Sequence, residues 1–173
     1  MTFQSWQQIH YPISASELEK SGASDIELVK HSVIKWQGLR EEVLQAHGLR
    51  ADADVIIPAE QSPVEPQADT FLLIDSDSCA LCQRFYDYGQ LCYDYDYDEA
   101  LEANENVCDF AALNACSECP LRKTIGHPCF IAEGYPHVTT EDTVDPYTAF
   151  ITHGNPEPMI AALEATLQRL EQL

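Results

Sequence analysis

The chain has 173 residues, and 29 acidic residues against nine basic ones give it a formal net charge of -20 at pH 7. This length suits one ordinary domain, and a hydrophobic content of 45% is enough for a packed core, which argues against global disorder. Because nucleic-acid binding needs a clustered face of Lys and Arg, the few scattered basic residues disfavour direct binding of DNA or RNA.

Neither a membrane span nor a signal peptide is visible in the sequence. It has no apolar run of the roughly 20 residues that a span needs, and its start lacks the basic and then apolar order of a signal peptide. We therefore expect a cytoplasmic protein. Since cytoplasmic thiols stay reduced, the seven cysteines are expected to hold metal or do redox chemistry rather than form structural disulfides.

Helical patterns dominate the first 50 residues. Ser24 followed three residues later by Glu27 is a capping box, and apolar residues continue from it at helical spacing as far as Trp36. Gly38 is expected to end or bend this helix before a second, short helix that stops at Gly48.

Beyond this region the pattern changes twice. Residues 51–69 contain three prolines and little periodicity, so we interpret them as an extended, Pro-rich linker. The apolar run 70–75, TFLLID, is predicted to be a short buried strand that leads to the first cysteines. Near the end of the chain, Asn155 is expected to cap an amphipathic helix with Pro156 at its first position.

The cysteines follow a repeated pattern of Cys, two residues, Cys, six residues, Gly, two residues, Cys. The two copies hold six of the seven cysteines: Cys79, Cys82, Cys92, Cys116, Cys119 and Cys129. Two Cys-x2-Cys pairs supply the four thiolates that a tetrahedral zinc ion takes. The two pairs, 79/82 and 116/119, are therefore the predicted ligands of a zinc site.

The remaining thiols leave the number of metal ions open. Cys92, Cys108 and Cys129 with His127 would make a second set of four, so that seven cysteines and one histidine fill two tetrahedral sites. Alternatively, Cys92 and Cys108 are ordinary buried residues, as free cysteine often is. Cys129 is then a fifth ligand or a substitute for one of the four, and one or two zinc ions are expected.

An acidic insert separates the two copies. Between Arg84 and Arg122 the chain has no basic residue and nine acidic ones, and Tyr alternates with Asp over residues 93–98. In a strand the tyrosines would share one face and the aspartates the other, which suits docking on a basic protein surface. The alternative is a strand with inward-packed tyrosines and a solvated acidic face. The candidate partner-binding residues are Tyr93, Asp94, Tyr95, Asp96, Tyr97 and Asp98.

Catalytic alternatives are weaker but stay open. A zinc metalloenzyme would use a less closed site around Cys129 and His127 with nearby acids. A thiol redox protein would need a thiolate of lowered pKa, which the acidic neighbours of the cysteines oppose. Motifs for phosphate binding, dinucleotide binding, metalloproteases and serine hydrolases are missing, so no catalytic residue is predicted.

Four segments carry a family resemblance: HSVIKWQGLR, CALC, CSECPL with the Gly and Cys that follow it, and GNPEPMIAAL. Together they resemble small uncharacterised zinc-binding proteins encoded by bacteriophages, over most of the chain. The resemblance implies zinc binding and a phage setting without implying a reaction. The Tyr/Asp insert and Cys108 depart from the family's pattern.

These observations predict an α+β, mainly helical fold, with N- and C-terminal helices packed together and a cysteine-rich zinc module embedded between them. The expected parts are a helical region (1–50), a linker (51–69), the zinc module (70–138) and a C-terminal segment with its helix (139–173), in one compact unit. The predicted function is a non-enzymatic, zinc-stabilised acidic binding protein. In a phage setting it would act in the host cytoplasm and block a basic, nucleic-acid-binding host protein by charge mimicry, without contacting nucleic acid or membrane itself.

Overall fold

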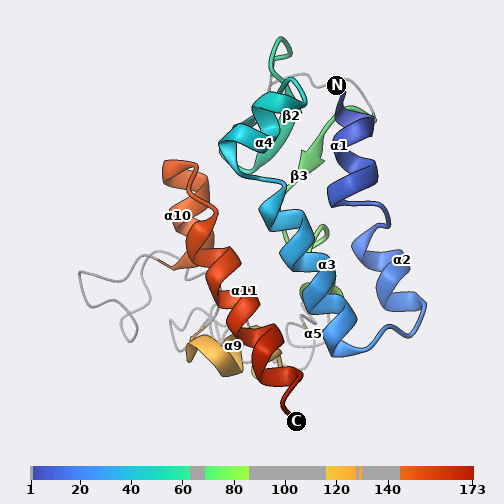
Figure 1. Cartoon of the computed structure of the whole chain (residues 1–173), viewed down its shortest axis with the longest axis vertical. Helices are drawn as coiled ribbons and strands as arrows, with labels where there is room; N and C mark the ends of the chain where they lie inside the picture. The colour runs from blue at the N-terminus through green and yellow to red at the C-terminus, as the bar shows by residue number, and fades with distance from the viewer. Residues whose placement is uncertain (1, 63–68, 86–115, 128, 130–144) are drawn as a thin grey trace, which may run out of the picture.

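The computed structural model describes residues 2–62, 69–85, 116–127, 129 and 145–173 (Figure 1). The expected class is confirmed, since the described residues form a mainly helical α+β structure with one small sheet. The helices are α1 (Phe3–His10), α2 (Ala15–Lys20), α3 (Asp25–Gln37), α4 (Glu41–Ala46), α5 (Ala80–Phe85), α9 (Pro120–Ile125), α10 (Pro146–His153) and α11 (Glu157–Leu170). The strands are β1 (Leu49–Asp52), β2 (Val55–Pro58) and β3 (Leu72–Leu73).

Side-chain caps fix the starts of the first three helices. Thr2, Ser14 and Ser24 each accept a hydrogen bond from the backbone N–H three residues on, and that third residue's side chain bonds back to the cap. Each reciprocal pair satisfies two backbone donors that a helix start otherwise leaves unpaired. The capping box that the sequence shows at Ser24 is thus present, and α3 ends at Gln37, directly before Gly38.

A three-stranded antiparallel sheet of order β1-β2-β3 follows α4. This sheet corrects part of the sequence prediction, which assigned all of residues 51–69 to an extended linker. The start of that segment is in the sheet, because Val55–Pro58 pairs with Leu49–Asp52. The turn between them contains Ala53 at φ 52, in the left-handed region that alanine rarely adopts. The strand expected at 70–75 is also shorter than predicted, and Leu73 within it is 43% exposed.

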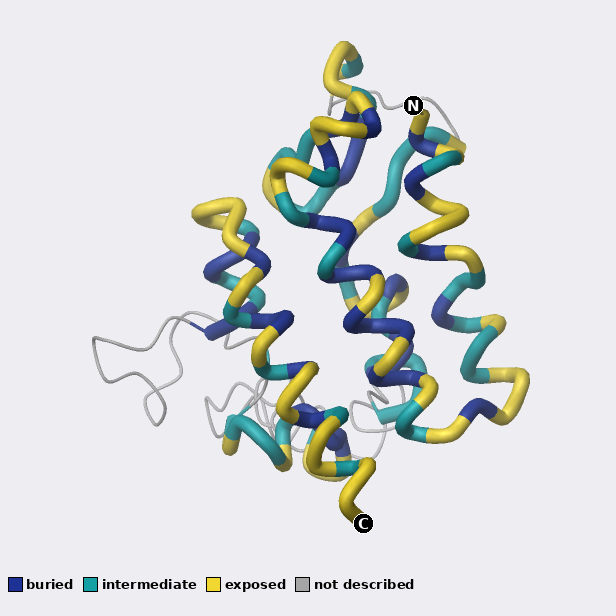
Figure 2. The backbone as a smooth tube through the Cα atoms, in the orientation of Figure 1, coloured by how far each residue is buried: buried dark blue, intermediate teal, exposed yellow. Residues whose placement is uncertain are grey.

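Helix α3 lies at the centre of the structure and packs against α1, α5 and α11 (Figure 1). Buried positions recur along both α3 and α11 (Figure 2), and the rings of Trp36 and Phe150 meet edge to face with centroids 5.2 Å apart. Such aromatic contacts add to the free energy of apolar burial. The cap of α11 is Pro156, one residue later than predicted, although Asn155 Oδ1 still accepts a bond from the Glu157 N–H.

The two short helices α5 and α9 lie at the end of the bundle near the C-terminus (Figure 1). Helix α5 packs on α2 and α3, whereas α9 packs on α11. The cysteine pairs are thereby placed at the junction of the N-terminal and C-terminal helices. Within the described ranges, each helix is too short or too polar to cross a lipid bilayer.

Candidate metal centre

Five cysteines from three separate stretches of chain line one pocket. Leu81, Phe85, Leu121 and Arg122 complete its lining, and the cavity measures about 20 Å³. A space of this size holds about one water molecule or one ion, not an organic substrate. The cysteines are Cys79 and Cys82 at the start of α5, Cys116 and Cys119 in the turn before α9, and Cys129 after it.

The first cysteine pair follows a tight turn between Asp75 and Ser78. The Ser78 N–H donates to Asp75 Oδ1 at 2.9 Å, and the Asp75 N–H donates to Ser78 Oγ at 3.0 Å. Helix α5 then starts as the Gln83 N–H donates to the Cys79 carbonyl at 3.0 Å. Cys79 directly precedes α5 and Cys82 lies in its first turn, and both line the pocket.

The second pair forms a knuckle of the same kind. The Cys119 N–H donates to the Cys116 carbonyl at 3.0 Å, and Cys119 is the cap residue of α9. Pro120 occupies the first helical position, as the sequence predicts, because its missing N–H is not needed there. Gly126, at φ 84, ends the helix in the left-handed conformation that glycine adopts freely.

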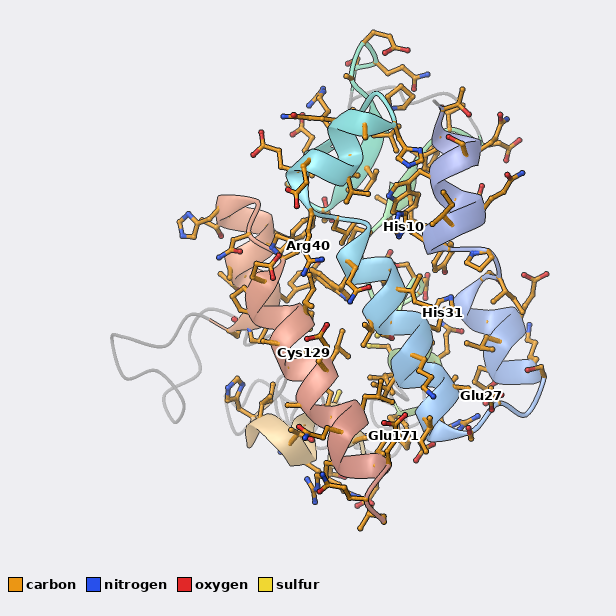
Figure 3. All side chains as sticks on the ribbon, viewed as in Figure 1. His10, Glu27, His31, Arg40, Cys129 and Glu171 are labelled. Atoms are coloured by element: carbon orange, nitrogen blue, oxygen red, sulfur yellow. The ribbon has the colours of Figure 1, made fainter. Side chains whose placement is uncertain are left out.

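Cys129, labelled in Figure 3, is held by the start of α10. Its carbonyl accepts a hydrogen bond from the Tyr147 N–H at 3.1 Å. The Tyr147 hydroxyl in turn donates to the Ile74 carbonyl at 2.6 Å, five residues before the first cysteine of the site. The third stretch is therefore tied to the first through one tyrosine.

The surroundings of the thiols set their protonation. Burial raises the pKa of Cys119 to about 11, and it raises the pKa of Cys116 and Cys129 as well. The hydrogen bond between Cys79 and Cys82 lowers the pKa of Cys79 and raises that of Cys82. Without metal, four of the five groups are therefore neutral thiols at pH 7, and a metal ion would have to displace their protons.

The donor chemistry of the pocket fits zinc. Zn–S distances of about 2.3 Å place two thiolates of a tetrahedral site about 3.8 Å apart, which is compatible with thiols in hydrogen-bond contact. No carboxylate or imidazole is among the pocket's described lining residues. However, the described part of the chain contains no group of three His, Cys, Asp or Glu side chains that lie close enough together to bind one metal ion. Binding an ion would thus require the thiols to close around it.

The structure brings together five of the eight candidate ligands. His127 is described but does not line the pocket. Cys92 and Cys108 lie outside the described residues, as does the Tyr/Asp run 93–98. The second metal ion and the acidic docking face therefore stay predictions.

Lys35 is a component of the site that the sequence does not reveal directly. Its side chain is 1% exposed, and Nζ donates to the carbonyl of Ser78 at 2.6 Å and to Ser78 Oγ at 3.2 Å. Leu28, Ser32, Lys35 and Leu39 follow one another at helical spacing, and all four are buried. A lysine in the centre of such a stripe is the signal that could have identified it.

Comparisons of the chain with protein-family models, with curated proteins and with solved structures each found no match. The resemblance to phage proteins accordingly stays an expectation from the sequence. The functional interpretation depends on the geometry of the cysteine pocket and on the charge of the chain.

Proposed function

We propose that the protein is a non-enzymatic, zinc-stabilised acidic binding protein in which the metal is structural. The supporting observation is the convergence of five cysteines from three stretches of chain on one ion-sized pocket. Structural zinc sites are closed by four protein ligands, mostly thiolates, whereas catalytic sites keep an open position and usually include His or a carboxylate. The described lining offers thiols alone as metal donors, which favours the structural class.

In this proposal Cys79, Cys82, Cys116 and Cys119 hold one zinc ion, and Cys129 is the fifth candidate. A zinc ion there would connect α5, which packs on α3, to α9, which packs on α11. Structural zinc supplies roughly 10 to 16 kcal/mol in small metal-binding peptides, comparable with the stability of an entire domain. The metal would thus fix the end of the bundle at which the acidic insert begins and ends.

Cobalt substitution tests the structural role of the metal. Co²⁺ in place of zinc is expected to show the charge-transfer and ligand-field bands of a tetrathiolate site, unchanged by added azide or cyanide. A spectrum that shifts when such a ligand binds would show an open coordination position, and it would support the metalloenzyme alternative instead.

The net charge of -20 supports the proposed binding role. So strong a negative field speeds encounter with a basic surface and repels nucleic acid, and the effect weakens as salt screens it. The partner that fits this chemistry is a basic, nucleic-acid-binding protein, in a phage setting one of the host cell, whose DNA- or RNA-binding face the acidic protein covers by charge mimicry.

Capture from host lysate tests this role with a matched control. Asp94→Asn, Asp96→Asn and Asp98→Asn together are expected to reduce capture of a basic nucleic-acid-binding protein, which duplex DNA and moderate salt should also release. The control replaces three exposed acids outside the insert with glutamine: Glu41, Glu42 and Glu60. Equal capture by both triple variants would overturn the acidic-face proposal.

One observation favours a second candidate, a thiol redox protein. The Cys79 and Cys82 thiols are hydrogen-bonded at the start of α5, and Cys79 has a lowered pKa, as in dithiol oxidoreductases. Such a protein would reduce a partner's disulfide while the two thiols form one of their own. Insulin reduction in the presence of a thiol reductant discriminates between the candidates, because zinc-bound thiols should give no acceleration until a chelator is added.

A further inference from the structure

Lys35 is the one fully buried Lys or Arg among the described residues. It forms none of the ion pairs in that part of the chain, all of which involve partly exposed side chains. Within the described residues, both hydrogen-bond acceptors of its Nζ are neutral, the carbonyl and hydroxyl of Ser78, and the ring centroid of Trp36 lies 6.0 Å from it. A buried ammonium without a carboxylate partner is strongly unfavourable unless a negative charge lies close by.

The cysteine site, together with Asp75, is where that negative charge would come from. Ser78, which holds the ammonium, directly precedes Cys79 in the chain. Burial lowers the pKa of Lys35, whereas Asp75 and any negative charge on Cys79, Cys82 or Cys129 raise it. Deprotonation of these three pocket cysteines by a bound metal would therefore favour the charged form of Lys35.

A tetrathiolate zinc complex carries a net charge of about -2, since four thiolates surround one divalent ion. A dry pocket stabilises such a complex only if positive groups lie around it. Arg122, which lines the pocket, is a second such group, and its charge lowers the pKa of Cys116 against the larger opposite effect of burial.

We propose that Lys35 is the built-in counter-ion of the metal–thiolate centre, with its ammonium fixed by Ser78 behind the first cysteine pair. It stabilises the fully deprotonated, anionic four-thiolate complex relative to the metal-free pocket. This inference rests on the proposed zinc site and adds a preference to it. The site should bind a divalent ion more tightly with four thiolate ligands than with a set in which a neutral donor replaces one thiolate.

Lys35→Met tests the inference because it removes the charge while keeping a similar unbranched side chain. Lys30→Met is the matched control, since Lys30 lies on the same helix, is half exposed and pairs with Glu171 at the surface. Zinc affinity is measured by competition with a chromophoric chelator, and urea unfolding is measured with and without zinc. We expect Lys35→Met to weaken zinc binding about 10- to 100-fold, as loss of a supporting residue around a metal site does. Lys30→Met should change it less than about threefold.

The stability of the metal-free proteins distinguishes a counter-ion from a lysine that only supports the fold. Metal-free Lys35→Met should lose less stability than the zinc-bound variant does, because without zinc the cysteine site carries less negative charge for the ammonium to balance. Unchanged zinc affinity would overturn the inference, and so would an equal loss of stability with and without metal.

If Lys35→Met does not fold, Ser78→Ala replaces it. Ser78→Ala should weaken zinc binding several-fold, and no change in zinc affinity would overturn the inference. A wild-type protein that binds no zinc would instead refute the proposed function.

Discussion

Cys119→Ser is the substitution that examines the zinc ligands most sharply. Cys119 is 8% exposed, receives no side-chain capping bond and begins α9, so serine preserves the size and the backbone contacts of the position. If four thiolates share a metal binding energy of roughly 10 to 16 kcal/mol equally, one ligand accounts for about 2.5 to 4 kcal/mol. The expected loss of zinc affinity is therefore about 60- to 700-fold.

The assay is zinc competition with a chromophoric chelator, with amide hydrogen exchange at α9 as a second readout. Cys129→Ser is the matched comparison, because Cys129 lines the same pocket but lies outside both Cys-x2-Cys pairs. We expect it to reduce zinc affinity clearly less than Cys119→Ser does, because it removes no bond to the ion. If Cys129→Ser weakens binding as much as Cys119→Ser or more, the assignment of the ligands to the two pairs is wrong.

Two further predictions concern the helical core. Burial lowers the pKa of His31 from 6.5, its Nε2 donates to the Ile13 carbonyl at 2.9 Å, and Nδ1 has no partner among the described residues (Figure 3). The folded state thus resists protonation, so the stability that His31 contributes above pH 6.5 should be lost as the pH falls through its lowered pKa. Urea unfolding of the wild type and His31→Gln from pH 5 to pH 8 measures this, and a difference independent of pH would contradict it. Leu163→Ala on α11 should reduce the free energy of unfolding by about 2 to 5 kcal/mol, and the half-buried Leu170→Ala by less. Equal losses in the two variants would contradict the packing of α11 on α3.

Local signals with a direct physical cause made parts of the fold predictable. Ser24 and Glu27 form a capping box. Its hydrogen bonds need only these two residue types three positions apart, and the helix begins there. Pro120 after a Cys-x2-Cys pair similarly indicates the first position of α9. In both cases the sequence contains the donor and acceptor, or the restricted φ, that starts the helix.

The hairpin of β1 and β2 could not be read in the same way. Its two-residue turn has Ala53 at a positive φ, where Gly, Asn or Asp would have been the usual turn signal. The tertiary pairing of Val55–Pro58 overrides the local preference of this alanine. The prolines later in the segment then made the whole of residues 51–69 resemble a linker.

The cysteine site was predictable as a set of residues but not as a structure. Spacing identified the two pairs, and the repeat suggested Cys129, yet spacing cannot show that residues of α5 and α9 line one pocket or that His127 does not. Lys35 was missed because a lysine on a helix is normally solvated, and its burial results from the packing of α3 on α5.

Native mass spectrometry of the purified, fully reduced protein is the most direct measurement of the zinc site. We expect at least one tightly held zinc ion per chain, and we expect chelation to remove it together with the hydrogen-exchange protection of α5 and α9. A protein that is metal-free as purified, takes up no zinc and still protects both helices would contradict the structural role of the metal.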